Sequence, residues 1–327
     1  MMESTAFIMG TIEISWNAIL IALAVFTWFF ASAALYTGKK NKVIAIWLML
    51  PFAFFLSAFL SRSVYWYSHQ SQFHGYLDAL KSTDLGAFSL LGILPGIFIS
   101  AALMRLFRIN TNLPQLLDDI SAPTSFMVAL LYLTCLFNDS CRGKILITNP
   151  AFHKLPFAYI NINPQGEAEY RLATFFIGFI IMLIIGIATL FFHFYHKKEK
   201  GLTAFFFLVY YSAAEFVIES TRYDAGYFPT NGFVSIIQIF SAVCVVATMV
   251  YFTVERAKKK GFGALIIILW ITQLLILTAT GILEYLVQRH GDWAYFLHPS
   301  MCVSCFFMAF VPMLMHPKKA PKANSDS

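Results

Sequence analysis

The sequence predicts an all-helical integral membrane protein: a polytopic bundle of about nine transmembrane helices, with its N-terminus outside and its C-terminus in the cytoplasm. Of the 327 residues, 59% are hydrophobic and only 12% are charged, whereas soluble domains carry about 25% charged residues. Apolar runs long enough to span a bilayer recur along the chain. These two observations exclude a soluble multidomain protein.

Each apolar run is a candidate span. The first run has no small-residue cleavage site, so we interpret it as a span rather than a removable signal peptide. The candidate spans are 15–37, 43–61, 86–107, 121–139, 172–195, 202–222, 232–254, 263–285 and 293–315.

The basic residues predict the orientation of the bundle. Alternate connections and the C-terminal tail hold 15 of the 23 Lys and Arg residues. The positive-inside rule places these segments in the cytoplasm, so the excess of basic charge requires no nucleic-acid partner. The basic segments are 38–42, 105–110, 196–201, 255–261 and 316–322.

Two long loops are expected on the outer side. The loop 61–84 is aromatic and polar, which suits the headgroup zone. The loop 140–171 could hold short strands, because Asn149-Pro150 and Asn163-Pro164 are turn signals. A site in this protein is therefore expected to open outward, or sideways to the outer leaflet.

The sixth span carries a charged face in its outer half. On a helical wheel starting at Tyr211, Glu215 falls at about 40°, Glu219 at about 80° and Arg222 at about 20°. An ionised group inside a bilayer costs at least about 2.5 kcal/mol unless it is paired or faces water. The clustering therefore predicts a pocket or internal channel on this side of the helix.

A simpler interpretation is an ion pair between Glu219 and Arg222 that only fixes the helix in the bundle. Glu215 would still need a proton, or a cation from another span such as Arg62. A third interpretation, a proton- or cation-coupled transporter, rests on the two glutamates alone. It is disfavoured because the sequence has no inverted repeat.

The cysteines and histidines predict no metal or cofactor. Cys135 and Cys141 lie on the outer side and could form a disulfide or stay free. Cys302 and Cys305 lie inside an apolar run, where packed small side chains are favoured over a redox or metal site. No paired Cys or His spacing typical of a metal site occurs in the chain.

The end of the sixth span resembles a known family signature. The stretch YSAAEFVIESTR (211–222), then Asp224, Gly226 and Ser235-x-x-Gln238, resembles the C-terminal signature of the bacterial prolipoprotein diacylglyceryl transferases. That signature reads Y-G-x-x-R-F-x-x-E-x-x-R, a short acidic-glycine loop and S-x-x-Q. The matching residues are Tyr211, Phe216, Glu219, Arg222 and Gln238.

Earlier stretches resemble the other motifs of this family in the same order. CLFNDSCRGK (135–144) is similar to the central G-C-F-x-x-G-C-C-x-G-K, and LGAFSLLGILPG (85–96) to G-G-x-S-F-H-G-G-x-x-G. Arg62 resembles the Arg-x-x-Tyr that ends the family's second span. The matching residues of the two longer motifs are Cys135, Cys141, Gly143, Lys144, Gly86, Ser89, Gly92 and Gly96.

The resemblance implies an activity and a division of the chain. It implies a seven-span transferase-like domain over 1–255, two additional spans over 256–315 and a cytoplasmic tail over 316–327. Members move a diacylglyceryl group from phosphatidylglycerol to a lipobox cysteine of a prolipoprotein signal peptide, in the bacterial cell membrane. It implies no cofactor.

The same resemblance implies which residues form the site. Tyr211, Glu219 and Arg222 are the expected catalytic residues. The expected substrate-binding residues are Arg62, Gly86, Gly92, Gly143, Lys144, Glu215 and Gln238.

Three positions depart from the family pattern. A histidine of the glycine-rich motif is Leu91 here, and two arginines are Tyr132 and Glu215. The sequence therefore predicts either a divergent transferase or an inactive lipid- or lipoprotein-binding protein of the same fold.

Two further expectations concern polar residues outside these motifs. One of the outer-loop histidines could replace the missing base. Glu284 and Arg289 are expected to form an interfacial pair. The histidines in question are His69, His74 and His153.

Overall fold

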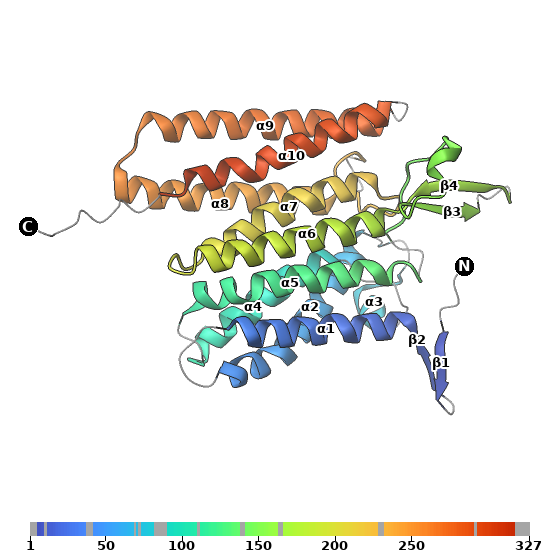
Figure 1. Cartoon of the computed structure of the whole chain (residues 1–327), viewed down its shortest axis with the longest axis horizontal. Coiled ribbons are helices and arrows are strands. Elements are labelled where there is room, and N and C mark those ends of the chain that lie inside the picture. The colour runs from blue at the N-terminus through green and yellow to red at the C-terminus, as the bar shows by residue number, and fades with distance from the viewer. Residues whose placement is uncertain are drawn as a thin grey trace, which may run out of the picture.

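The computed structural model describes most of the chain as one bundle of long helices lying side by side (Figure 1). Both β-hairpins lie at one end of the bundle, and the last helix ends at the other (Figure 1). The described residues are 5–9, 12–36, 42–68, 70, 73–81, 90–109, 112–137, 141–162, 166–227, 232–290 and 293–317.

The long helices follow the predicted spans. In chain order they are α1 (Trp16–Leu35), α2 (Lys42–Ser68), α4 (Ile93–Leu106), α5 (Leu113–Thr134), α6 (Thr174–Tyr195), α7 (Leu202–Thr221), α8 (Ile236–Lys260), α9 (Ala264–Arg289) and α10 (Ala294–Met315). Eight of them are long and apolar enough to cross a membrane, and α4 is a shorter apolar helix of 14 residues. The prediction of a polytopic helical membrane protein is confirmed.

Short elements occupy the connections at the hairpin end. The strands β1 (Thr5–Met9) and β2 (Ile12–Ser15) pair antiparallel, as do β3 (Ala158–Ile162) and β4 (Ala168–Leu172). The helix α3 (Tyr76–Lys81) follows α2, and a 3-10 turn (Leu90–Gly92) leads into α4. The expectation of strands within 140–171 is confirmed.

Several helix boundaries differ from the predicted spans. The helix α4 begins at Ile93 and not 86, and α8 ends at Lys260 and not 254. The helix α2 continues to Ser68 and not 61, so Arg62 lies inside a helix and not at its end. The helix α5 begins at Leu113 and not 121, with a proline in its first turn. Asp118 and Asp119 interrupt the apolar run here, so hydrophobicity alone set the predicted start too late.

Those two aspartates are buried, and Asp118 fixes the start of α7. Its carboxylate accepts the backbone N–H of Gly201 at 2.6 Å and that of Ala204 at 2.8 Å. The first N–H groups of a helix have no partner within the helix, so a side chain that accepts them acts as a cap. Gly201 adopts φ 89°, a left-handed conformation that favours glycine. Asp118 therefore holds the N-terminus of α7 against α5.

Replacing Asp118 by alanine should lower the free energy of unfolding by about 1–2 kcal/mol, because two buried donors lose their acceptor. Denaturant unfolding of the purified protein in detergent measures this. Asp78→Ala is the matched control, since the exposed Asp78 accepts one backbone N–H, that of His74. Equal losses in the two variants would contradict the capping role.

The central helix of the bundle is α5. It packs against α1, α4, α6 and α7, and 72% of its most apolar stretch is buried. On one side α2 packs against α4, and on the other α10 packs against α7, α8 and α9. The candidate site lies where α1, α2, α4, α5 and α7 face one another at the hairpin end.

Glycine residues permit the close approach of α4 to α2. A Cβ at Gly92 would overlap the backbone of Ser61, and one at Gly96 would overlap Ser57. Gly92 was predicted to bind substrate, and the alternative of helix packing accounts for its position.

Candidate functional site

An extended segment, residues 141–146, brings the central motif into contact with the end of α7. Its Lys144 N–H donates to the carbonyl of Thr221 at the end of α7 at 2.9 Å. The N–H of Tyr223 donates to the carbonyl of Arg142 at 2.7 Å. The central motif is therefore held against the charged end of α7.

Gly143 makes this approach possible. Its N–H donates to the carbonyl of Leu172 at 3.1 Å, and a Cβ at this position would overlap that same oxygen and the hydroxyl of Thr174. Gly143 was predicted to bind substrate. The structure gives it a backbone role beside the site.

Arg222 lies between two carboxylates directly after α7. Its Nε and Nη2 donate to the two oxygens of Asp224 at 3.0 and 2.8 Å, and its Nη1 donates to Glu219 at 3.1 Å. The second oxygen of Glu219 accepts the N–H of Gly226 at 3.2 Å. Such charge-assisted, two-pronged contacts are strong and directional. The Glu219–Arg222 ion pair expected from the sequence is present, and Asp224 extends it.

A cavity of about 320 Å³ opens beside this cluster. Apolar side chains of α1, α2, α4 and α5 form most of its wall, and Glu219, Arg222 and Asp224 line its polar part. Ligand pockets typically combine an apolar wall with a few convergent polar groups in this size range. The predicted pocket on this face of α7 is therefore present next to Glu219 and Arg222.

Two cysteines line the same cavity. Cys135 and Cys141 are buried free thiols in the structure, so of the two states open from the sequence it shows the unpaired one. A hydrogen bond with Cys135 and then burial raise the pKa of the Cys141 thiol well above its usual value. Cys141 adopts φ 56°, and its N–H donates to Asp224 at 3.0 Å. The central motif thus supplies a neutral sulfur surface and a backbone donor to the site.

Glu215 points to a different neighbour. Its two carboxylate oxygens accept the hydroxyl of Tyr132 at 3.0 and 2.9 Å. Both side chains are buried, and neither lines the cavity. Arg62, the cation proposed as partner, instead donates to the carbonyl of Ala79 and stacks near Phe73. The two positions where the family pattern has arginines therefore contact each other in this chain.

A glycine on α6 makes room for Tyr132. A Cβ at Gly178 would come within 2.7 Å of two carbons of the Tyr132 ring. Real side chains essentially never pack this closely, so this glycine allows Tyr132 to reach Glu215 on α7.

Gly178→Ala should therefore destabilise the protein by about 1–3 kcal/mol, as overpacked cores generally do. Gly281→Ala is the matched control on α9, where a Cβ would meet nothing within 4 Å. Alanine there should be neutral or stabilising by up to about 1 kcal/mol. Thermal unfolding of both variants in one detergent tests the difference, and a stable Gly178→Ala protein would contradict it.

The remaining predicted site residues fall into three groups. Gln238 forms a capping box with Ser235 at the start of α8, so its position is accounted for by local structure. Tyr211 is buried one turn before Glu215. Gly86 lies outside the described residues, as do the other residues of its motif between 85 and 89. Of Leu91 only the backbone is described.

No histidine lines the cavity within the described part of the chain. His74 is exposed near α3. The Nε2 of His153 lies 2.8 Å from the carbonyl of Ile147, and its ring stacks on Tyr170. His69 lies outside the described residues. The structure thus places neither His74 nor His153 where the missing base is expected.

Sequence reasoning missed Asn17, a polar residue of the first apolar run. Asn17 is buried, lines the cavity, and its amide oxygen has no hydrogen-bond partner among the described residues. A buried polar atom without a partner is costly, which makes it a candidate for contact with a ligand. An asparagine at the outer end of an otherwise apolar span was the available signal.

Comparisons with known proteins agree with these motifs. Residues 4–254 match the sequence model of a family described as prolipoprotein diacylglyceryl transferase. Proteins from two strains of Staphylococcus epidermidis, both named phosphatidylglycerol–prolipoprotein diacylglyceryl transferase, are 23% identical to this chain over 270 residues. These matches cover 79% of this chain and 91% of each relative.

Proposed function

Because the chain belongs to the prolipoprotein diacylglyceryl transferase family, we propose that it moves a diacylglyceryl group from phosphatidylglycerol to a prolipoprotein cysteine. The observation that carries this proposal is the apolar cavity with Arg222 at its polar part. An apolar wall suits acyl chains, and a guanidinium suits a phosphate. The proposed acceptor is a lipobox cysteine, and the proposed location is the bacterial cell membrane.

The proposed reaction is a displacement at carbon. The acceptor sulfur, as a thiolate, forms a bond to the glycerol carbon that carries the phosphate. The bond between that carbon and the phosphate oxygen breaks, and glycerol phosphate leaves with the electron pair. The thiol proton passes to a base. The chain must therefore stabilise a leaving phosphate.

Arg222 can supply this stabilisation. A guanidinium has five N–H donors. Glu219 accepts one of them and Asp224 accepts two. The remaining donors can bind a phosphate oxygen. Burial raises the pKa of Asp224, but Arg222 outweighs it and holds that pKa below its usual value. Asp224 therefore stays ionised and orients Arg222, which makes it a poor candidate for the base.

A second candidate function is a non-catalytic lipid- or lipoprotein-binding protein of the same fold. The observation that favours it is the Tyr132–Glu215 contact, which replaces two arginines of the family pattern with a phenol and a carboxylic acid. A site with fewer cations stabilises a leaving phosphate less well. The cavity itself would still bind lipid.

One experiment separates the two functions. The purified protein in vesicles of phosphatidylglycerol is given a lipobox peptide, and the thioether product and released glycerol phosphate are measured by mass spectrometry. The staphylococcal relative serves as the positive control. Product in both samples supports the transferase. Product from the relative alone, with lipid retained by this protein, favours the binding function.

A further inference from the structure

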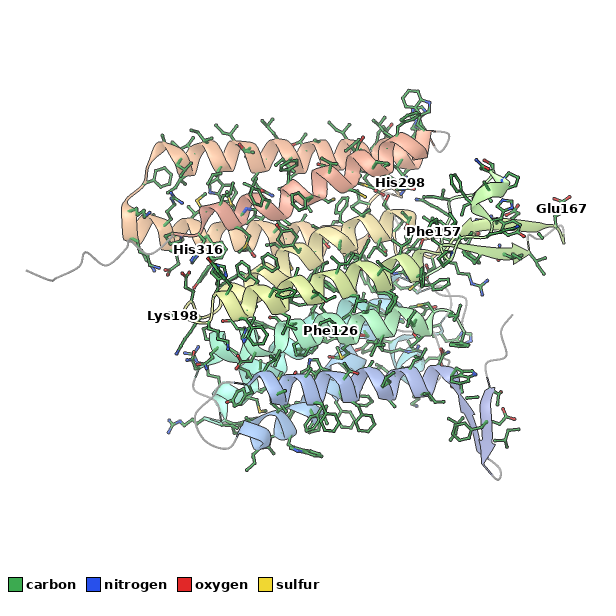
Figure 2. All side chains as sticks on the ribbon, viewed as in Figure 1. Phe126, Phe157, Glu167, Lys198, His298 and His316 are labelled. Carbon is green, nitrogen blue, oxygen red and sulfur yellow. The ribbon has the colours of Figure 1, made fainter. Side chains whose placement is uncertain are left out.

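The helix α9 contacts the central motif, although the family match ends within α8. The contact is made by Lys144, which reaches away from the cavity toward α9. Its Nζ donates to the side-chain oxygen of Gln288 at 3.0 Å and to the hydroxyl of Tyr227 at 3.3 Å. Figure 2 shows α9 and α10 side by side above α7 and α8, with the hairpin β3–β4 at the same end as the start of α10.

Gln288 passes this contact on to a buried acid. Its Nε2 donates to Glu284 at 2.6 Å and to the hydroxyl of Tyr227 at 3.0 Å. Glu284 is only 1% exposed, and its second carboxylate oxygen has no hydrogen-bond partner among the described residues. The prediction that Glu284 forms an interfacial pair with Arg289 is therefore wrong, because Glu284 is buried while Arg289 is exposed.

A buried acid is an expensive way to join two helices. Apolar side chains of the same size would pack α9 against its neighbours without removing a carboxylate from water. The Gln288 amide instead links the acid to the ammonium group, because it donates to Glu284 and accepts from Lys144. That arrangement indicates a role for the position and charge of Lys144.

The electrostatic surroundings of Lys144 agree with this role. Burial leaves the pKa of Lys144 below its usual value, and the carboxylates of Glu284 and Glu219 offset part of this effect. Glu219 is the residue that pairs with Arg222 and lines the cavity. Glu284 therefore favours the charged form of Lys144 next to the cluster of Arg222, Glu219 and Asp224.

We propose that Glu284 and Gln288 are positioning residues for the transfer site, holding the Lys144 ammonium beside Glu219 so that α9 is part of that site. Lys144 then neutralises part of the charge on Glu219, which leaves Arg222 more available to an anionic headgroup. This effect on headgroup binding rests on the proposed function. The placement and protonation of Lys144 do not depend on the proposed function.

The first test therefore does not use activity. Amine-reactive labelling of Lys144 at mildly alkaline pH is followed by peptide mass spectrometry in wild type, Glu284→Gln and Gln288→Leu. The neutral amine is the reactive form, so removing the nearby carboxylate should speed labelling by about tenfold. Glu255→Gln is the matched control, because Glu255 pairs with Lys259 at the far end of α8. It should leave the labelling of Lys144 unchanged.

The second test uses binding and transfer. Glu284→Gln should weaken retention of phosphatidylglycerol by about threefold to tenfold, and Glu284→Asp should restore part of it. Unchanged Lys144 labelling in both Glu284→Gln and Gln288→Leu, with folded protein, overturns the positioning role. Faster labelling with no transfer by the wild-type protein leaves the positioning role standing and rejects the proposed transferase.

Discussion

Replacing Arg222 by glutamine should lower the rate of diacylglyceryl transfer at least about 100-fold, the loss typical of removing one preorganised donor for a developing anion. Arg222 is the cation that lines the polar part of the cavity within the described residues. Glutamine keeps a hydrogen-bond donor but no charge. The leaving phosphate would then develop negative charge close to Glu219 and Asp224 with less to offset it.

The same change should also destabilise the protein. Glu219 is 1% exposed at its side chain, and it would lose its ion-pair partner. Removing one member of a buried pair costs about 3–5 kcal/mol, and the value here should lie near the lower end because the side chain of Asp224 is 28% exposed. An inactive variant could thus simply be unfolded.

Arg222→Lys separates these effects. Lysine keeps the positive charge for Glu219 but cannot reproduce the two-pronged contact with Asp224. It should retain most of the stability and still transfer at least about tenfold more slowly. Arg171→Gln is the matched control, since Arg171 pairs with Glu169 on the hairpin β3–β4 and does not line this cavity. Full transfer activity in Arg222→Lys would contradict the proposed role.

The sequence predicts the parts of this site that lie close together along the chain. The charged face of α7 follows from helical geometry alone, because Tyr211, Glu215 and Glu219 are spaced by four residues. The turn at Asn149-Pro150 follows from local chemistry in the same way, since the Asn149 side chain accepts the N–H of Ala151, whereas Asn163-Pro164 lies outside the described residues. Helix ends were less accurate where buried acids interrupt an apolar run, as Asp118 does in α5.

The contacts between helices could not be predicted from such spacing. A helical wheel shows that Glu215 faces inward, but not that Tyr132, 83 residues earlier, meets it there. That contact depends on Gly178 of a third helix. In the same way, the sequence predicts that Glu284 lies at the membrane surface. Only the structure shows that Gln288 connects it to Lys144 by hydrogen bonds.

Tyr132→Phe should lower the free energy of unfolding by about 1.5–3 kcal/mol, more than loss of an ordinary hydroxyl, because both oxygens of Glu215 lose their hydrogen bond. Glu215 is 3% exposed, so water cannot readily replace the phenol. Tyr210→Phe is the matched control on α7, where the half-buried Tyr210 should change stability by less than about 0.5 kcal/mol.

The double variant Tyr132→Phe with Glu215→Leu should recover most of this loss. A buried polar pair can often be exchanged for apolar side chains of similar volume at little cost, whereas removing one partner is expensive. The expected coupling in a double-mutant cycle is therefore about 1–3 kcal/mol, measured by denaturant unfolding in detergent. Strictly additive losses would show that the two residues act independently.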